Sequence, residues 1–203
     1  MSIKTATLNG VATIEIARPE KKNALTAAMY QAMADALRAA QADGAVRAVL
    51  ITGQPGVFTS GNDIELHCDF AYVSDEARLA MPFVGLGLVP EFASSLLLPQ
   101  LMGQARAAEK LLLGDPFTGA DAVEIGLANA VLPAGEVVNH ARRVAERFNS
   151  LPPGAVREAK KLLRKPHADA IRQTIQAEAE VFAARLRSPE AMEAFQAFFQ
   201  KRK

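Results

Sequence analysis

Hydrophobic and polar positions alternate in two short runs at the start of the chain and then recur at helical spacing. Residues 3–8 and 11–17 flank Asn9-Gly10, a pair that tolerates positive φ, so we expect a β-hairpin. Thr26 fits a helix N-cap, and apolar residues then recur every three or four positions up to residue 40. Residues 46–52 (VRAVLIT) are mostly apolar and β-branched, which is typical of a strand covered on both faces in a parallel sheet. This order predicts a right-handed strand–helix–strand crossover.

The rest of the chain predicts one loop, two further short strands and several helices. Glycine, proline and serine mark a loop at residues 53–61. Short strands are expected at residues 69–73 and 128–132. We therefore expect an α/β core over residues 1–150 and a helical region over residues 151–203. The remaining helices are predicted after Ser94-Ser95 and at residues 104–113, 118–125, 137–149, 155–164, 168–186 and 189–201.

Composition and charge exclude several function classes. The chain has 203 residues, 50% of them hydrophobic, with a formal net charge of +1, so nothing indicates nucleic acid or an anionic membrane surface as a partner. No apolar run approaches the roughly 20 residues that span a bilayer, and we expect no signal peptide. The single cysteine, Cys68, suits a reducing compartment, so a cytoplasmic location is expected. The three histidines show no metal-ligand spacing, and no metal site is expected.

The loop that follows the apolar strand is the first candidate for chemistry. Ligands of open α/β folds bind at the carboxyl ends of strands, where residues 58–63 (FTSGND) lie. Gly61 lets backbone approach a ligand closely, and the amide of Asn62 can then point at a carbonyl oxygen, as an oxyanion hole requires. Taken alone, this segment is more typical of an ordinary strand-to-helix turn.

Several segments together resemble the crotonase, or enoyl-CoA hydratase/isomerase, family. The resemblance implies an α/β fold with a crotonase-like ββα spiral core and a helical C-terminal region. It also implies an acyl-CoA thioester as substrate, with no separate cofactor, and a homo-oligomer, either a trimer or a hexamer, assembled through the C-terminal helices. The segments match the family in order along the chain: RPEKKNAL at residues 18–25, VRAVLITG running into FTSGND, DFAYVSDEAR at residues 69–78, LGLVP at residues 86–90, and DPFTGADAVEIGLANA at residues 115–130.

The resemblance assigns roles to residues of this chain. Asn62 follows the loop glycine and would donate one oxyanion amide. Lys22 also has a second interpretation, as a solvated basic residue beside Lys21, and the two readings stay open. The residues implied to line the coenzyme A path are Lys22, Ala24, Leu25, Ser60, Gly61, Asp63 and Ile64.

Two positions bear on which reaction is catalysed. Hydratases of the family use two glutamates, and Phe83 occupies the position of the second, where an apolar ring cannot transfer a proton but can line the acyl site. Glu91 matches the single glutamate of the isomerase branch, and its apolar neighbours would raise its pKa. The resemblance therefore implies an enzyme that moves a 3-enoyl-CoA double bond to the 2 position. Three alternatives stay open: a hydratase-like enzyme, an inactive acyl-CoA-binding or assembly protein, and a Glu91 that only decorates a helix start.

One departure from the family is large. Between Glu65 and Leu66 the family has a helical stretch, a central strand and a glycine-rich turn that supplies the second oxyanion amide. Here Glu65 runs directly into Leu66-His67-Cys68. An omitted stretch, a real internal deletion and engineering would each explain the gap. The resemblance thus predicts a core that lacks one strand–turn–helix segment and half of an oxyanion hole.

Overall fold

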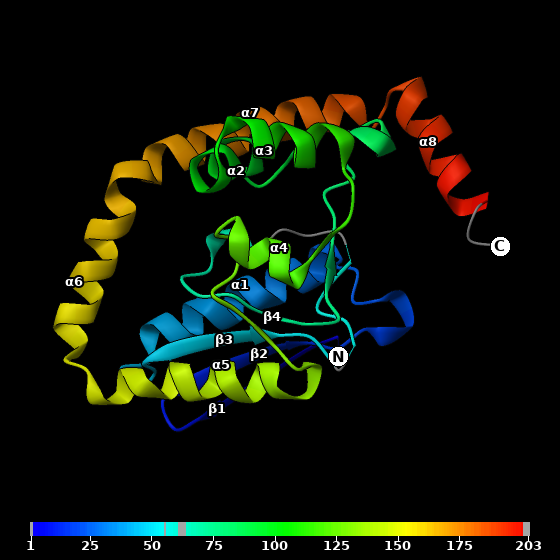
Figure 1. Cartoon of the computed structure of the whole chain (residues 1–203). Helices are drawn as coiled ribbons and strands as arrows, with labels where there is room; N and C mark the ends of the chain where they lie inside the picture. Colours follow the sequence, from blue (N-terminus) through cyan, green and yellow to red (C-terminus); the bar gives the residue numbers. More distant parts are fainter. Residues whose placement is uncertain (1, 55, 61–63, 201–203) are drawn as a thin grey trace. The chain divides into compact units, whose positions relative to one another are not determined.

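The computed structural model describes residues 2–54, 56–60 and 64–200 (Figure 1). The chain forms two compact units, each made of two segments. Unit 1 comprises Met1–Asn62 and Leu132–Leu162, and unit 2 comprises Asp63–Val131 and Leu163–Lys203. Each unit gathers residues that contact one another, so it combines segments that are distant in the sequence. The expected boundary between residues 150 and 151 divides the chain differently and stays a prediction.

Unit 1 is built on a three-stranded sheet in the order β1-β2-β3. Strands β1 (Ile3–Leu8) and β2 (Val11–Ile16) pair antiparallel around Asn9-Gly10, where both residues have positive φ. Strand β3 (Ala48–Thr52) pairs parallel with β2, and α1 (Ala27–Ala42) connects them. The predicted hairpin and the strand–helix–strand order with a parallel pair are therefore confirmed, and the right hand of the crossover stays a prediction. The predicted burial of β3 on both faces is wrong in part, because Val49 keeps 38% of its surface exposed.

The core of unit 1 follows from the alternation of the sequence. Val11, Ile14 and Ile16 of β2 are almost fully buried, and α1 turns Met29 and Met33 inward. The N-cap of α1 is Thr26, whose side chain accepts a hydrogen bond from the backbone N–H of Met29, as predicted. The other elements of unit 1 are η1 (Pro19–Lys21), η5 (Ala134–Glu136), α5 (Val137–Glu146), η6 (Arg147–Ser150) and α6 (Pro153–Arg164), which runs on into unit 2.

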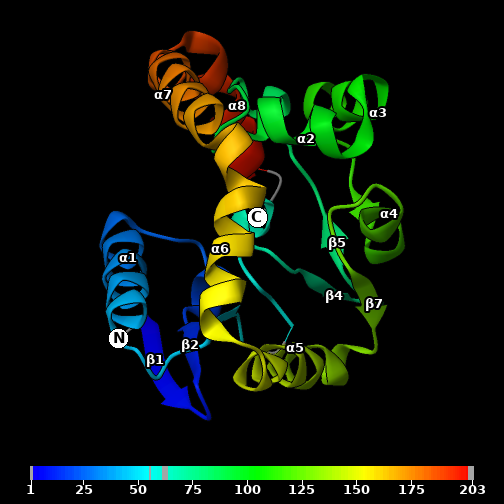
Figure 2. The same ribbon diagram turned by 90° about the vertical axis from the view of Figure 1, so that its left-hand side faces the viewer.

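Unit 2 is mostly helical, and Figure 2 shows its helices α2, α3 and α4 from a second side. Its short strands pair as β4 (Tyr72–Ser74) with β7 (Ala130–Leu132) and β5 (Arg78–Leu79) with β6 (Phe117–Thr118). The helical elements are η2 (Ile64–His67), η3 (Val84–Leu86), α2 (Ser94–Met102), α3 (Gln104–Ala108), η4 (Glu109–Leu113), α4 (Gly119–Glu124), η7 (Lys165–His167), α7 (Ala168–Arg185) and α8 (Pro189–Gln200).

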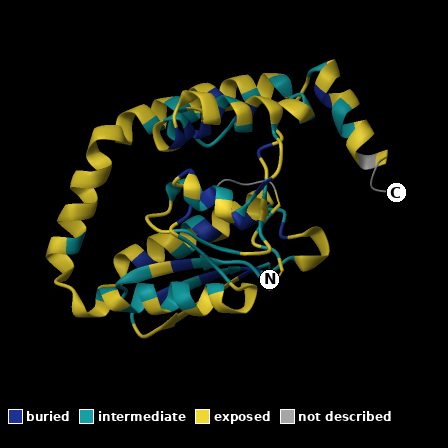
Figure 3. Ribbon diagram, in the orientation of Figure 1, coloured by how far each residue is buried: buried dark blue, intermediate teal, exposed yellow. Residues whose placement is uncertain are grey.

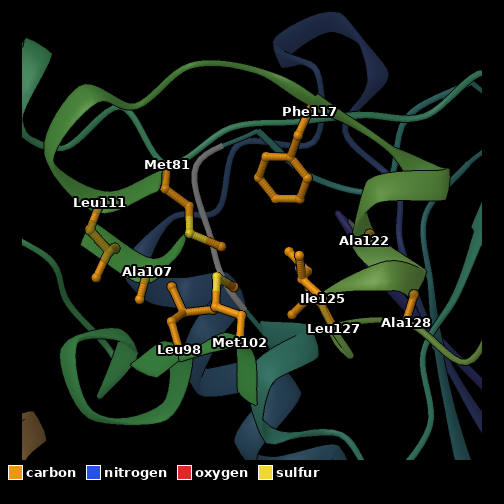
Figure 4. Packing of buried hydrophobic residues seen from close by; sticks show 10 residues of the cluster. All are labelled: Met81, Leu98, Met102, Ala107, Leu111, Phe117, Ala122, Ile125, Leu127 and Ala128. Atoms are coloured by element: carbon orange, nitrogen blue, oxygen red, sulfur yellow. The ribbon is translucent and has the colours of Figure 1, made fainter. Parts of the chain in front are cut away.

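A single hydrophobic cluster forms the core of unit 2. It joins residues from α2, α3, η4, β6, α4 and the turn that follows α4 (Figure 4). Leu98 and Ala122 are fully buried within it. The capping box of Thr118 and Asp121 starts α4 and satisfies two backbone N–H groups at that helix end. The members are Met81, Leu98, Met102, Ala107, Leu111, Phe117, Ala122, Ile125, Leu127 and Ala128.

The sheet is interrupted where the sequence predicts a missing strand. After β3, the next strand of the described chain is β4, and η2 is the element between them. β4 pairs with β7 and belongs to a separate two-stranded sheet rather than extending the sheet of β1, β2 and β3. This arrangement fits a crotonase-like core that lacks an interior strand. Within the described ranges, no helix combines the length and apolarity needed to cross a membrane.

Candidate active site

Glu91 lies in the loop between η3 and α2 and is half-buried in unit 2. Burial raises the pKa of its carboxyl group above the ordinary value, and the nearby charge of Glu178 raises the pKa further. The sequence predicted this direction from the apolar neighbours of Glu91. A carboxyl group with a raised pKa is suited to exchanging protons near neutral pH.

The backbone around Glu91 adopts an unusual conformation. Phe92 and Ala93 both have φ of 61°, in the left-handed region that residues with a Cβ rarely occupy. Such residues persist where surrounding contacts over-determine them, and they cluster at functional sites. Here His67 Nε2–H donates to the carbonyl oxygen of Phe92 at 2.7 Å. The His67 ring also packs edge-on against the Phe92 ring, with 4.4 Å between the ring centroids. The Ser94 hydroxyl donates to the carbonyl oxygen of Glu91 at 2.7 Å.

Glu178 on α7 fixes the other side of this loop. Its Oε2 accepts from the backbone N–H of Ala93 at 2.6 Å, and its Oε1 accepts from the backbone N–H of Ser95 at 3.0 Å and from the Ser95 hydroxyl. The residue is 8% exposed. Sequence reasoning missed Glu178, because it stands in a helix among other polar residues and no local signal separates it from a solvated glutamate.

Asn23 organises the candidate coenzyme A segment of unit 1. Its side chain is fully buried, and its Oδ1 accepts from the backbone N–H of Arg18 at 2.7 Å. Its Nδ2 donates to the carbonyl oxygens of Val57 and Phe58, each at 3.0 Å, while the Thr59 hydroxyl donates to the carbonyl oxygen of Asn23 at 2.9 Å. Asn23 therefore ties the RPEKKNAL turn to the loop after β3. The sequence offered Asn23 only as part of that motif, without this role.

Three polar side chains are buried in the described part of the chain, and they share one property. They are Asn23, Ser94 and Glu178, and each bonds the backbone of a segment that the sequence predicted to carry function. Buried polar groups are costly unless they are satisfied. Their location therefore supports the choice of these two segments.

The other predicted site residues divide between the two units. In unit 1, Lys22 and Ser60 are exposed, whereas Ala24 and Leu25 are partly buried. In unit 2, Ile64 is buried, and Phe83 is partly buried against the hydrophobic cluster. Gly61, Asn62 and Asp63 lie outside the described residues. Among the residues with described positions, no group of histidine, cysteine and carboxylate side chains is arranged to hold a metal ion.

Comparison with known proteins identifies the class to which this fold and these segments belong. The family model for enoyl-CoA hydratase/isomerase matches residues 6–66 and 61–203. The chain therefore belongs to the enoyl-CoA hydratase/isomerase, or crotonase, family, and the predicted fold class is confirmed.

Two solved structures share the fold over nearly their whole length. OdaA of Pseudomonas aeruginosa is 43% identical with a TM-score of 0.94, covering 97% of this chain and 98% of that one. An enoyl-CoA hydratase/isomerase from Pseudoalteromonas atlantica is 33% identical with a TM-score of 0.94, covering 99% of this chain and 98% of that one.

One curated relative of this chain is named as an isomerase. Rat enoyl-CoA delta isomerase 2 is 28% identical over 95% of this chain, and the match spans 62% of the rat protein. The alignment runs over 243 positions, more than the 203 residues of this chain, so it includes positions that only the rat protein occupies. The two family-model matches meet at residues 61–66, which is where the sequence predicts the missing segment.

Proposed function

We propose that this chain is an acyl-CoA enzyme that moves the double bond of a 3-enoyl-CoA to the 2 position, with Glu91 as the base. The observation that carries the proposal is the half-buried Glu91 carboxyl group, whose pKa is raised and whose loop is held in an unusual conformation by its neighbours. A raised pKa makes the carboxylate a stronger base, which suits it to accepting a proton and returning it. Relatives named enoyl-CoA delta isomerase support an isomerase activity.

The proposed reaction needs one shuttling carboxylate and no separate cofactor. The Glu91 carboxylate removes a proton from C2, and the electron pair of that C–H bond delocalises onto the thioester oxygen as a dienolate. The backbone amide of Asn62 would donate to this oxygen. Glu91, now a carboxylic acid, returns the proton to C4, so that the C3–C4 double bond is replaced by one between C2 and C3 and the thioester carbonyl re-forms. Proton and electrons balance within the substrate and Glu91.

Residues of the turn before α1, of the loop after β3 and of the segment before η3 are expected to hold the substrate. The turn that contains Lys22, Ala24 and Leu25 would carry the nucleotide end of coenzyme A, together with Ser60, and the exposed ammonium group of Lys22 could attract its phosphates. Phe83 would line the acyl side. Gly61, Asp63 and Ile64, together with the residues of that turn, would line the adenine and pantetheine path, as the family resemblance implies.

The decisive experiment measures isomerisation of a 3-enoyl-CoA by the unmodified chain and by Glu91→Gln. We expect Glu91→Gln to lower kcat by about 100-fold or more, since general acid–base groups contribute on that order. Glu193→Gln, an exposed glutamate on α8, is the matched control and should leave kcat unchanged. Equal activity of Glu91→Gln and the unmodified chain would remove Glu91 from the mechanism.

A hydratase-like activity is the second candidate, and named relatives favour it. A Bacillus subtilis probable enoyl-CoA hydratase is 29% identical over 70% of this chain. Phe83 argues against hydration, because it stands where a hydratase has its second glutamate and cannot move a proton. Incubation with a 2-enoyl-CoA in water separates the two reactions. Binding of a coenzyme A thioester without either activity would instead support an acyl-CoA-binding protein.

A further inference from the structure

Glu178 stands out because it is a buried carboxylate that the proposed chemistry does not use directly. Both of its oxygens are engaged, Oε2 with the N–H of Ala93 at 2.6 Å and Oε1 with the N–H of Ser95 at 3.0 Å and with the Ser95 hydroxyl. Helices α2 and α7 contact each other, and this contact brings Glu178 to the N-terminal end of α2. Glu178 and its partners Ala93 and Ser95 are more than eighty positions apart in the sequence. Burying a carboxylate is costly, and these three hydrogen bonds offset the cost.

The start of α2 lacks a cap from its own sequence. Ala93 occupies the N-cap position with φ of 61°, and no side chain of the flanking segment caps the helix. The first N–H groups of a helix have no partner within the helix, and the helix dipole favours a negative charge there. Glu178 supplies both the acceptors and the charge from α7. The start of α2 is therefore fixed by a residue of another helix.

Glu91 directly precedes the unusual backbone that this contact holds. The carbonyl oxygen of Glu91 accepts from Ser94, the carbonyl oxygen of Phe92 accepts from His67, and the N–H of Ala93 donates to Glu178. Each peptide group from Glu91 to Ala93 thus has a fixed partner. Since Phe92 and Ala93 occupy the left-handed region, loss of one partner would let the loop relax toward commoner backbone angles.

We propose that Glu178 is a positioning residue that holds the Glu91 carboxyl group in place through the N-terminus of α2. This inference rests on the proposed role of Glu91 as the base. Displacement of a catalytic group by about 1 Å can lower turnover by about 100-fold. Removing the contact should therefore lower kcat while the affinity for the coenzyme A portion of the substrate stays nearly unchanged.

The test compares Glu178→Ala and Glu178→Gln with the unmodified chain in the 3-enoyl-CoA assay. We expect Glu178→Ala to lower kcat by about tenfold to 100-fold with KM changed less than about threefold. Glu178→Gln keeps one acceptor oxygen and the side-chain shape, so we expect it to recover part of kcat. Glu180→Ala, an exposed glutamate of the same helix, is the matched control. A kcat for Glu178→Ala within twofold of the unmodified chain would overturn the inference.

A second measurement reads the Glu91 carboxyl group directly and does not require activity. Two titratable side chains bond this loop from other elements, Glu178 on α7 and His67 on η2. Carbon-13 NMR of the Glu91 carboxyl should show its titration moving to lower pH in Glu178→Gln, since one cause of the raised pKa is gone. Hydrogen exchange at the Ala93 and Ser95 amides should accelerate in Glu178→Ala. Unchanged titration and unchanged exchange would overturn the inference.

The two proposals fail in different ways. If Glu91→Gln is as active as the unmodified chain, or the chain has no isomerase activity, the proposed function fails, and the NMR and exchange results alone decide whether Glu178 holds Glu91 in place. If Glu91→Gln is inactive and Glu178→Ala is fully active, the role of Glu178 fails and the proposed function stands. Circular dichroism of each variant verifies that the helices are intact, and Glu178→Gln serves where Glu178→Ala does not fold.

Discussion

At the scale of single residues, Asn23 joins two segments that are distant in sequence. Its amide group bonds the backbone at Arg18, Val57 and Phe58, and its own φ of 56° suits asparagine better than most residues. No other described polar side chain of unit 1 is buried. The candidate coenzyme A turn and the loop toward Asn62 are therefore held together by the Asn23 side chain, together with the Thr59 hydroxyl that donates to the carbonyl oxygen of Asn23.

We predict that Asn23→Ala lowers the free energy of unfolding by about 3 kcal/mol. The change leaves three partly buried backbone groups, at Arg18, Val57 and Phe58, without this partner. A buried group left unpaired costs about 1–3 kcal/mol, and partial exposure and relaxation lower the sum. Urea denaturation followed by circular dichroism measures the effect. Asn139→Ala, an exposed asparagine on α5, should change the free energy by less than about 0.5 kcal/mol. A similar midpoint for the two variants would contradict the prediction.

The residues of the candidate site were predictable to the extent that their signal is local. Glu91 was found because it matches the single glutamate of the isomerase branch that the sequence resembles, and its apolar neighbours predicted the burial that raises its pKa. Glu178 was not found, because its meaning depends on where α7 contacts α2. Charged residues in a helix are usually solvated, so the sequence alone favours the wrong interpretation for Glu178.

At the scale of elements, α8 packs against the turn that follows η3. Gly87 has φ of +70°, and a Cβ there would lie 2.7 Å from the backbone nitrogen of Ala191 and 2.8 Å from its Cα. Arg185 adds a hydrogen bond of 3.0 Å to the carbonyl oxygen of Gly87 and an ion pair with Glu190. The start of α8 thus fits against a residue that has no side chain.

We predict that Gly87→Ala loosens α8 and destabilises the chain by about 2–3 kcal/mol. The added methyl group meets helix backbone, which cannot move aside as a flexible side chain would, and the left-handed conformation adds about 1 kcal/mol. Gly85→Ala is a matched control from the same turn, since a Cβ there meets nothing within 4 Å. Limited proteolysis should cleave near α8 faster in Gly87→Ala only, and equal cleavage of both variants would refute the prediction.

Elements were predicted well where capping and periodicity act within a few residues, and less well where distant pairing decides. The helix after Ser94-Ser95 appears as α2, and the predicted capping of α1 is present. The strand expected at residues 69–73 is shifted to β4, Tyr72–Ser74. Its start is set by Asn129, which exchanges hydrogen bonds with the backbone of Ala71 at 2.7 and 2.8 Å before pairing with β7 begins. Periodicity along the strand contains no information about that partner.

At the scale of the whole molecule, the family fold persists although an interior segment has no counterpart in the chain. The sheet of β1, β2 and β3 and the pairs β4–β7 and β5–β6 are three separate sheets. The ribbon of the C-terminal helices is coloured mostly as exposed in Figure 3. Several apolar residues of these helices are exposed, among them Val181 at 50% and Met192 at 53%. The expected trimer or hexamer stays a prediction, and such residues would contribute to its interfaces.

The absent segment should lower turnover more than it lowers affinity for coenzyme A. The segments implied to hold coenzyme A, residues 22–25 and 60–64, are present in the chain, whereas the turn implied to supply the second oxyanion amide is not. A donor to the oxyanion acts mainly on the dienolate, so its loss affects the chemical step rather than substrate binding. The loss of one such donor costs about 100-fold or more in kcat.

We therefore predict a kcat for 3-enoyl-CoA isomerisation about 100-fold below that of rat enoyl-CoA delta isomerase 2, with dissociation constants for a saturated acyl-CoA within about tenfold. The rat protein is the comparison because its alignment extends over positions that this chain lacks. Calorimetry with the saturated acyl-CoA and steady-state kinetics measure the two quantities, and the intact mass verifies that the tested chain has no residues between Glu65 and Leu66. A matching kcat would mean that another donor replaces the missing amide, whereas loss of binding together with turnover would mean that the absent segment helps to build the coenzyme A site.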